Sequence, residues 1–595
     1  MKITPARYLL LLALVLPCAR EVAAQAPLEP AQMPSNTTFY FIWRGQPSGE
    51  LRKTNSIAAL WDDPGFAPIR SSIANALLKN SAEKSTDKSL DESAQKPAEP
   101  HLTREQLEQY ASLVENPFVL GYLSDPQKKG FVVSAVPSAP KVASWNGIFF
   151  VYDRTGKEAI LSKAVLGLRA SEKEIPQLSQ MAVAGVPVLK VQRKSGVTYW
   201  VEDGKYAVSA NETAVLEEIL HRLSGKSPVS GSLADSAAYK EAQSTLGSGQ
   251  AEFFLRVPEL KALASDSSAG GFSMRPVLTA IKLDSIHSLS GRVLLEGAKT
   301  RVQAVALGDT SPGSLFDIWD QGTAAPPALN FIPADTVSYT DTQINLSGLY
   351  ELIKRIATSV LPPGRQGNVD MLEMMAQTRL GQSLSSAIAL FTGEFASLQT
   401  SPALDNHKQV YLVGIRNKPD TLKLLHTMLS DRLASERTEG EITFMKISTG
   451  GSSSAAGTAG WDFYHVAATA DYLVIAPRLA TVRELLASRT HTAGAGLSGA
   501  PGFQSARSQF PATINGLGYF DFSKVDWQAL KARLIAEAGK ASSTKRGPGA
   551  KSSIPTSTPA WIPNMNPDVF ARHLHVASSA SWKDAQGLHF DEWIQ

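Results

Sequence analysis

The feature that most constrains this chain is one pattern of residues that occurs twice. Val197–Leu220 reads VTYWVEDGKYAVSANETAVLEEIL, and Trp461–Leu486 reads WDFYHVAATADYLVIAPRLATVRELL. In the first copy, two short β-rich runs flank Asp203 and Gly204, a pair typical of a tight hairpin because glycine tolerates positive φ. Asn211 is then a good helix N-cap, and the apolar residues after it share one helical face. The pattern predicts strand, turn, strand and helix.

The second copy predicts the same elements. Leu479, Val482 and Leu485 share one face of its helix. Its second strand, Tyr472 to Ile475, is apolar on both faces, so we expect that strand in the centre of a sheet.

The flanking segments repeat as well. Each copy is preceded by a strand, a helix and a further strand, and is followed by a second helix and a strand. Tyr239 and Phe503 are 264 residues apart in the sequence, and Phe254 and Tyr519 are 265 residues apart. A spacing kept over so many elements is typical of an internal repeat.

These patterns predict an α+β protein of two tandem divergent repeats, residues 34–310 and residues 326–595. Each half begins with a strand and ends in two strands, the last pair beginning at His573. We expect a largely antiparallel sheet in each, with helices packed on one face. The order of elements resembles a split βαβ kernel with extra strands.

Composition agrees with folded domains of this size. The chain has 595 residues, 43% of them hydrophobic and 19% charged, which is enough for more than one large core. Three stretches depart from this average because they are rich in charge, serine or glycine: 79–104, 448–460 and 540–559. They bury too little apolar surface to order themselves, so we predict mobile segments there.

The first residues have the composition of a secretory signal. Lys2 and Arg7 flank the apolar run Tyr8–Leu16, and small residues follow, so residues 1–26 are predicted to be a cleaved signal peptide. The run is shorter than the roughly 20 residues of a membrane span. No later segment is apolar for long enough to span. We expect export to a periplasmic or extracellular location, or association with the cell envelope.

Cys18 is the only cysteine, and it lies inside the predicted signal. The mature chain would then hold no disulfide and no cysteine-based site. Lipidation of Cys18 is the alternative, although Pro17 stands where lipoprotein signals have a small residue. The net charge of +3 is small for this length, so nucleic acid is not an expected partner.

Two short motifs resemble catalytic or cofactor signatures. Gly494, Gly496 and Gly499 fit G-x-G-x-x-G but follow a predicted helix, so we expect a connector and no nucleotide or other cofactor. Ser81 and Ser85 each begin an S-x-x-K match inside the charged insertion, where no folded shell would hold a nucleophile.

The C-terminal region holds the most site-like cluster. If His573 and His575 lie on one strand, they share a face and could bind a metal together with His589 or Asp591 of the next strand, close to Glu592. The alternative is a set of polar residues on an exposed strand face, and we favour it. We therefore assign no metal ligand and no catalytic residue.

Glu394, in FTGEFASL, is a carboxylate just before an apolar run. It has no acid or base partner at motif spacing. We expect it at a turn or a strand end.

Several phrases of the chain resemble a bacterial exported family known only as a domain of unknown function. The resemblance covers most of the mature chain and is stronger in its second half. It implies export and supplies no catalytic residue. The phrases are PADTVSY (333–339), TGEFASL (392–398), VYLVGIRNKPDTLKLL (410–425), DYLVIAPRLATVRELL (471–486) and GYFDFSKV (518–525).

Together these features predict an exported, non-catalytic protein that binds or scaffolds a partner in the cell envelope. Two alternatives remain open. One is a carrier for apolar ligands, and the other is a metal-dependent hydrolase that uses the C-terminal histidines. The identity of the partner does not follow from the sequence.

Overall fold

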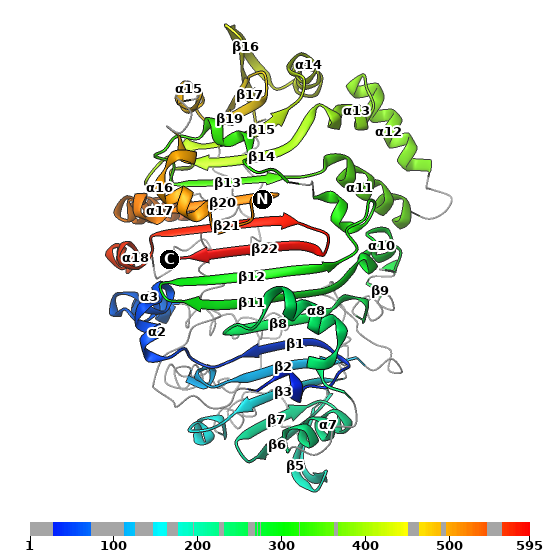
Figure 1. Cartoon of the computed structure of the whole chain (residues 1–595). Helices are drawn as coiled ribbons and strands as arrows, with labels where there is room; N and C mark the ends of the chain where they lie inside the picture. Colours follow the sequence, from blue (N-terminus) through cyan, green and yellow to red (C-terminus); the bar gives the residue numbers. More distant parts are fainter. Residues whose placement is uncertain are drawn as a thin grey trace, which may run out of the picture. The chain divides into compact units, whose positions relative to one another are not determined.

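The structure is a computed structural model of the whole chain (Figure 1). It describes residues 28–72, 112–124, 147–162, 177–193, 196–224, 231–259, 268–269, 272–273, 275–319, 322–361, 367–449, 463–488, 496–543 and 562–595. The predicted signal peptide, Ser81, Ser85, Gly494 and nearly all of the three predicted mobile segments lie outside these residues.

The chain divides into two compact units. Unit 1 comprises residues 1–275, 287–304 and 538–569, and unit 2 comprises residues 276–286, 305–537 and 570–595. Both contain helices and a large antiparallel sheet, so the protein belongs to the α+β class, as predicted.

Every strand pair described in the unit 1 sheet is antiparallel. In spatial order the strands are β11, β8, β1, β2, β3, β7, β6, β5 and β4. Their bounds are β1 Thr37–Trp43, β2 Phe118–Leu123, β3 Ile148–Asp153, β4 Gln177–Val183, β5 Val186–Arg193, β6 Gly196–Asp203, β7 Tyr206–Ala210, β8 Ala251–Arg256 and β11 Ile286–Glu296; β12 is Lys299–Gly308, and two short strands are β9 Ser268–Ala269 and β10 Phe272–Ser273.

The unit 2 sheet is also antiparallel. In spatial order its strands are β22, β21, β20, β13, β14, β15, β19, β18, β17 and β16. Their bounds are β13 Ser338–Gln343, β14 Phe391–Gln399, β15 Gln409–Ile415, β16 Leu433–Glu439, β17 Ile442–Ser448, β18 Phe463–Ala468, β19 Tyr472–Ala476, β20 Gly516–Asp521, β21 Val576–Lys583 and β22 Gly587–Ile594.

Helices join the strands and cover parts of each sheet. In unit 1, α7 contacts β7 and β3, and α8 contacts β8, as Figure 1 also shows. The helices are α2 Gly49–Thr54, α3 Ser56–Asp62, α7 Thr213–Leu223, α8 Ala237–Leu246, α10 Arg275–Ala280, α11 Leu346–Val360, α12 Gly367–Leu380, α13 Leu384–Ala389, α14 Lys418–Leu429, α15 Leu479–Ser488, α16 Pro501–Arg507, α17 Trp527–Ser543 and α18 Pro567–His573.

Several local predictions are confirmed. Gly204 has a φ of 54° between β6 and β7, which is the left-handed conformation that the hairpin required. Strand β19 lies between β15 and β18, so Tyr472–Ala476 is central in its sheet. The face of α7 that carries Leu216 and Ile219 is fully buried.

Two local predictions are wrong. Glu212, and not Asn211, is the N-cap of α7, because the side-chain oxygen of Asn211 accepts a hydrogen bond of 2.9 Å from Gly147 N instead. The strand expected from His573 begins only at Val576, since His573 is the last residue of α18.

No helix among the described residues is long and apolar enough to cross a membrane.

Candidate functional site

One face of the unit 1 sheet carries apolar side chains that are only half-buried. On β1, Tyr40 and Ile42 are fully buried, so Phe39 and Phe41 point to the opposite face because side chains alternate along a strand. Phe41 is paired with Leu120 on β2 and with Phe253 on β8. Apolar residues therefore lie side by side across these strands.

The row continues onto β3, where Phe150 is paired with Leu120. We call Phe150, Leu120, Phe41 and Phe253 the apolar row. Leu120 and Phe253 are 38% and 37% exposed, although β2 and β8 both have neighbours on either side in the sheet. Phe118 joins the row, with its ring centroid 5.9 Å from that of Phe41 and 5.8 Å from that of Phe150.

The corresponding row of unit 2 is polar. Tyr411, Ser397, Thr340, Gly518 and Ser579 are paired one after another across β15, β14, β13, β20 and β21. The hydroxyl oxygens of Thr340 and Ser397 are 2.8 Å apart. A Cβ on Gly518 would lie 2.3 Å from Ser579 Oγ, so glycine leaves room for that hydroxyl. The two sheets thus differ at the places of Phe41 and Leu120, where unit 2 has hydroxyl groups. At the places of Phe150 and Phe118 unit 2 keeps aromatic residues, Tyr411 and Phe395, which are 37% and 38% exposed.

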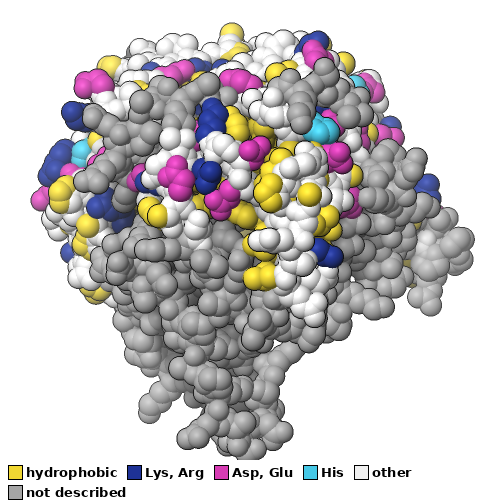
Figure 2. Space-filling view, turned by 90° about the horizontal axis from the view of Figure 1, so that it is seen from below, with side chains coloured by type: hydrophobic (Ala, Val, Ile, Leu, Met, Phe, Trp, Pro, Cys, Tyr) yellow, Lys and Arg dark blue, Asp and Glu magenta, His cyan; other side chains and the backbone are white. Residues whose placement is uncertain are grey.

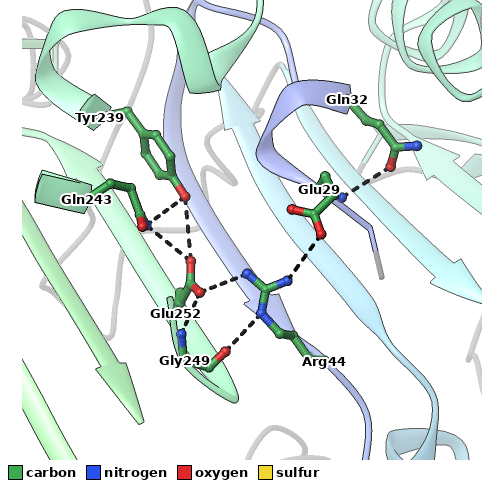
Figure 3. A network of polar contacts seen from close by, with 7 residues as sticks. All are labelled: Glu29, Gln32, Arg44, Tyr239, Gln243, Gly249 and Glu252. Carbon is green, nitrogen blue, oxygen red and sulfur yellow. Dashed lines mark hydrogen bonds and ion pairs between the residues drawn. The ribbon is translucent and has the colours of Figure 1, made fainter. Parts of the chain in front are cut away.

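The other face of the unit 1 sheet carries a buried polar network around Glu252 (Figure 3). Arg44 Nη2 donates to Glu252 Oε1 at 2.8 Å, and Gly249 N donates to the same oxygen at 2.7 Å. Gln243 Nε2 donates to Glu252 Oε2 at 3.3 Å and to the Tyr239 hydroxyl at 2.8 Å. The charge of Glu252, which is 4% exposed, is compensated by this cation and these donors.

A small cavity of about 10 Å³ adjoins this network and is lined in part by Tyr40, Tyr239, Glu252 and Ser290. That volume suits a single water molecule. The Tyr40 hydroxyl and Ser290 Oγ lack a hydrogen-bond partner among the described residues, and a water there would satisfy both. Burial raises the pKa of Tyr40 and Tyr239, so both phenols stay neutral. Neutral phenols and a compensated carboxylate suit a structural role, not acid–base catalysis.

Glu394 does not lie at a turn or a strand end. It is inside β14 and 4% exposed, which corrects the sequence-based expectation. Ala328 N donates to Glu394 Oε1 at 2.8 Å, and the Tyr472 hydroxyl donates to Oε2 at 2.5 Å. The neighbouring strand carries Asp341, whose pKa rises to about 8 because of burial and then the charge of Glu394. Hydrophobic periodicity gives no signal for such a pair, because both acids stand where apolar residues are expected.

The C-terminal histidines do not form the metal site that the sequence left open. The favoured alternative, polar residues on an exposed strand face, is wrong as well, because His589 and Asp591 are 7% and 2% exposed. His573 ends α18 and His575 precedes β21, so the two do not share a strand face. His589 stacks on Trp582 at 5.0 Å, and its Nε2 lies 2.9 Å from Asp584 Oδ2. Among the described residues no group of three or more His, Cys, Asp or Glu is arranged to hold a metal.

Asp591 and Glu592 lie on β22, next to His589 in sequence. Asp591 is buried, and burial raises the pKa of Glu592 to about 7. Of the glycine motif, Gly496 bridges to Pro333 and Gly499 ends a 3-10 turn, so neither opens an α-helix in the way a phosphate loop does.

Elsewhere the surface is mixed. Figure 2 shows hydrophobic side chains reaching the surface in small groups between charged ones. Scattered apolar residues of this kind are ordinary for a folded protein. The apolar row differs because its members are adjacent across four strands.

No family model, no curated protein and no solved structure matches this chain.

Proposed function

We propose that this protein is an exported, non-enzymatic binding or scaffolding protein of the cell envelope. It consists of two divergent copies of one α+β unit, and the apolar row of unit 1 is its contact surface. Half-exposed adjacent apolar residues carry this proposal, because exposed apolar surface in a contiguous patch is characteristic of binding faces.

The duplication is supported by the order of the strands. Starting from Tyr40 in unit 1 and Tyr339 in unit 2, the pairings can be followed outward strand by strand. Phe254 then matches Tyr519 on one side, and Val208 matches Val474 on the other. We call residues related in this way matched residues.

Packing supports the same relation. In unit 1, Tyr239 packs edge-to-face on Phe254 with ring centroids 5.2 Å apart and planes at 81°. In unit 2, Phe503 packs on Tyr519 at 5.4 Å and 74°. These are the two residue pairs aligned from their spacing in the sequence, and the same contact recurs with the tyrosine and phenylalanine exchanged.

The divergence of the copies supports a special role for unit 1. Its Phe41 and Leu120 match Thr340 and Ser397 of unit 2. The two units thus have the same strand order but differ in chemistry at these two central places. Because β1 and β13 are central strands, edge effects do not account for the difference.

The test is native mass spectrometry of the full chain purified from its own envelope without detergent exchange. We expect a bound partner protein or an apolar molecule at reproducible stoichiometry. Reproducible absence of both would count against a binding function.

A carrier for apolar molecules is the second candidate, and the apolar row also favours it. The two candidates differ in what is bound. Delipidated and native samples with identical masses would argue against a carrier, whereas a protein adduct that survives delipidation would favour the scaffolding role.

The metal-dependent hydrolase has weaker support, since His573 and His575 do not share a strand face. Equal, near-zero metal content in the wild type and in a His573→Ala/His575→Ala variant would remove it. Membership of the exported family of unknown function remains part of the proposal.

A further inference from the structure

The core of unit 2 holds two acids where unit 1 has none at the matched places. Asp341 of β13 matches Ile42, and Glu394 of β14 matches Pro117. Asp341 is 3% exposed and Glu394 is 4% exposed. Burying two carboxylates beside each other is costly unless one of them is neutral or a cation lies between them.

Hydrogen bonds distinguish the two acids. Glu394 accepts two donors, Ala328 N at 2.8 Å and the Tyr472 hydroxyl at 2.5 Å, so it is the member that is suited to carry the charge. Neither side-chain oxygen of Asp341 has a partner among the described residues that meets the distance and angle of a hydrogen bond. A protonated Asp341 would gain a donor, and Glu394 is the nearby acceptor that interacts with it.

A second observation points into the same place. The Tyr339 hydroxyl, on a side chain that is fully buried, also lacks a full hydrogen bond among the described residues. Burial and then the charge of Asp341 raise the pKa of Tyr339, so its hydroxyl remains protonated and close to the acid pair. The pKa of Tyr472, on β19, is raised as well, by burial and then by its interactions with Glu394 and Asp341.

We propose that Asp341 and Glu394 together bind one proton in the core of unit 2, and that losing this proton loosens the pairing of β13, β14 and the neighbouring strands. We take the ligand to be a proton, because two neighbouring carboxyl groups can share a proton without any cavity between them. The groups that act on the pair are Tyr339 on β13, Tyr472 on β19 and, through Tyr472, Asp471. This inference does not rest on the proposed binding function.

The direction of the pH effect follows from the raised pKa of Asp341. An exposed aspartate has a pKa near 3.9, and Asp341 reaches about 8 in the folded protein. The folded state therefore holds a proton that the unfolded state releases. Below a pH of about 4 the proton makes its full contribution to the free energy of unfolding. That contribution declines as the pH rises and is lost above a pH of about 8.

The experiment compares urea unfolding of the wild-type full chain and the Asp341→Asn variant between pH 5.5 and 8.5. The wild-type unfolding constant should rise by up to about tenfold per pH unit from this one proton. Asp341→Asn should lose that part of the slope. An unchanged slope in the variant would overturn the proposal.

Two controls keep the interpretation specific. Glu592→Gln removes the other acid with a raised pKa among the described residues of unit 2. This variant should keep the part of the pH slope that is due to Asp341. Asp521→Asn removes a buried acid that has Lys524 Nζ at 3.4 Å, so it controls for the loss of a buried carboxyl group elsewhere in unit 2. A loss of slope in Asp521→Asn equal to that in Asp341→Asn would contradict the assignment.

A direct measurement covers the case in which Asp341→Asn fails to fold. Carboxyl ¹³C shifts of aspartate-labelled wild-type protein should include one residue that titrates near pH 8. If every aspartate titrates below pH 5, the proton site does not exist.

Discussion

At the scale of single residues, the ion pair of Arg44 and Glu252 marks a difference between the two units. Matched residues in unit 2 are Gln343 and Leu517, so the charged pair of unit 1 is replaced there by an amide and an apolar side chain. Unit 1 thus keeps the buried Glu252 beside a cation, and unit 2 has neither charge at the matched residues.

This pairing predicts a coupling between the two positions. Arg44→Gln alone should destabilise the protein by about 3 kcal/mol, because Glu252 loses its cation. Glu252→Leu alone leaves Arg44 with the more distant Glu29 Oε1, 3.8 Å from its Nη1, as its acidic partner. The double variant should cost about 1–3 kcal/mol less than the sum of the two single changes. Urea unfolding of the four proteins measures this, and additive costs would contradict the idea that the residues act as a pair.

Sequence reasoning could not find these buried polar groups. Arg44 and Glu252 are far apart in the chain, as are Asp341 and Glu394, and neither pair has a motif spacing. Each acid occupies a strand position on the buried face, where periodicity predicts an apolar residue. His573 and His575, by contrast, are close in sequence and so suggest a site, but His573 ends α18 and His575 precedes β21.

At the scale of elements, complementary packing links strands β2 and β3. Gly121 is paired with Phe149, and a Cβ on Gly121 would lie 2.0 Å from Phe149 Cζ, so the ring occupies the space above the glycine. The matched pair in unit 2 is Leu398 with Val410. One copy packs a small residue against a large one, and the other packs two residues of intermediate size.

This exchange predicts a rescue. Gly121→Leu alone should destabilise the protein by about 3 kcal/mol, because the new side chain collides with a fully buried ring. Gly121→Leu with Phe149→Val restores the unit 2 pair and should recover most of that loss. Thermal unfolding of both variants checks the prediction, and equal destabilisation would show that the two sheets do not pack alike.

Many of the strands could be predicted from the sequence, and the missed ones have a physical reason. Strands with strong apolar patterns, such as β3, β15 and β19, were found in the sequence. Strands β4 and β16 were not, because almost every residue in them is exposed and their hydrogen bonds leave no hydrophobic pattern.

At the scale of the whole molecule, the chain has two α+β units whose strands follow the same spatial order. At the matched central places unit 1 has Phe41 and Leu120, and unit 2 has Thr340 and Ser397. The sequence predicts a repetition, which stays a prediction. It does not predict the apolar row, because the members of that row lie on strands from distant parts of the chain. Neither the exposure of Leu120 nor its contact with Phe41 follows from local sequence.

The central claim is that the apolar row of unit 1 is the binding surface, and exchanging matched residues tests it most directly. The variant Phe41→Thr/Leu120→Ser gives unit 1 the residues of unit 2, and Thr340→Phe/Ser397→Leu is the reciprocal control. Each is purified from its own envelope and compared with the wild type by native mass spectrometry, with circular dichroism to confirm folding. We predict that the first variant loses at least about tenfold in bound partner or apolar ligand, equivalent to about 1.4 kcal/mol, while the control retains it. Equal occupancy in the wild type and the folded Phe41→Thr/Leu120→Ser variant would contradict the account.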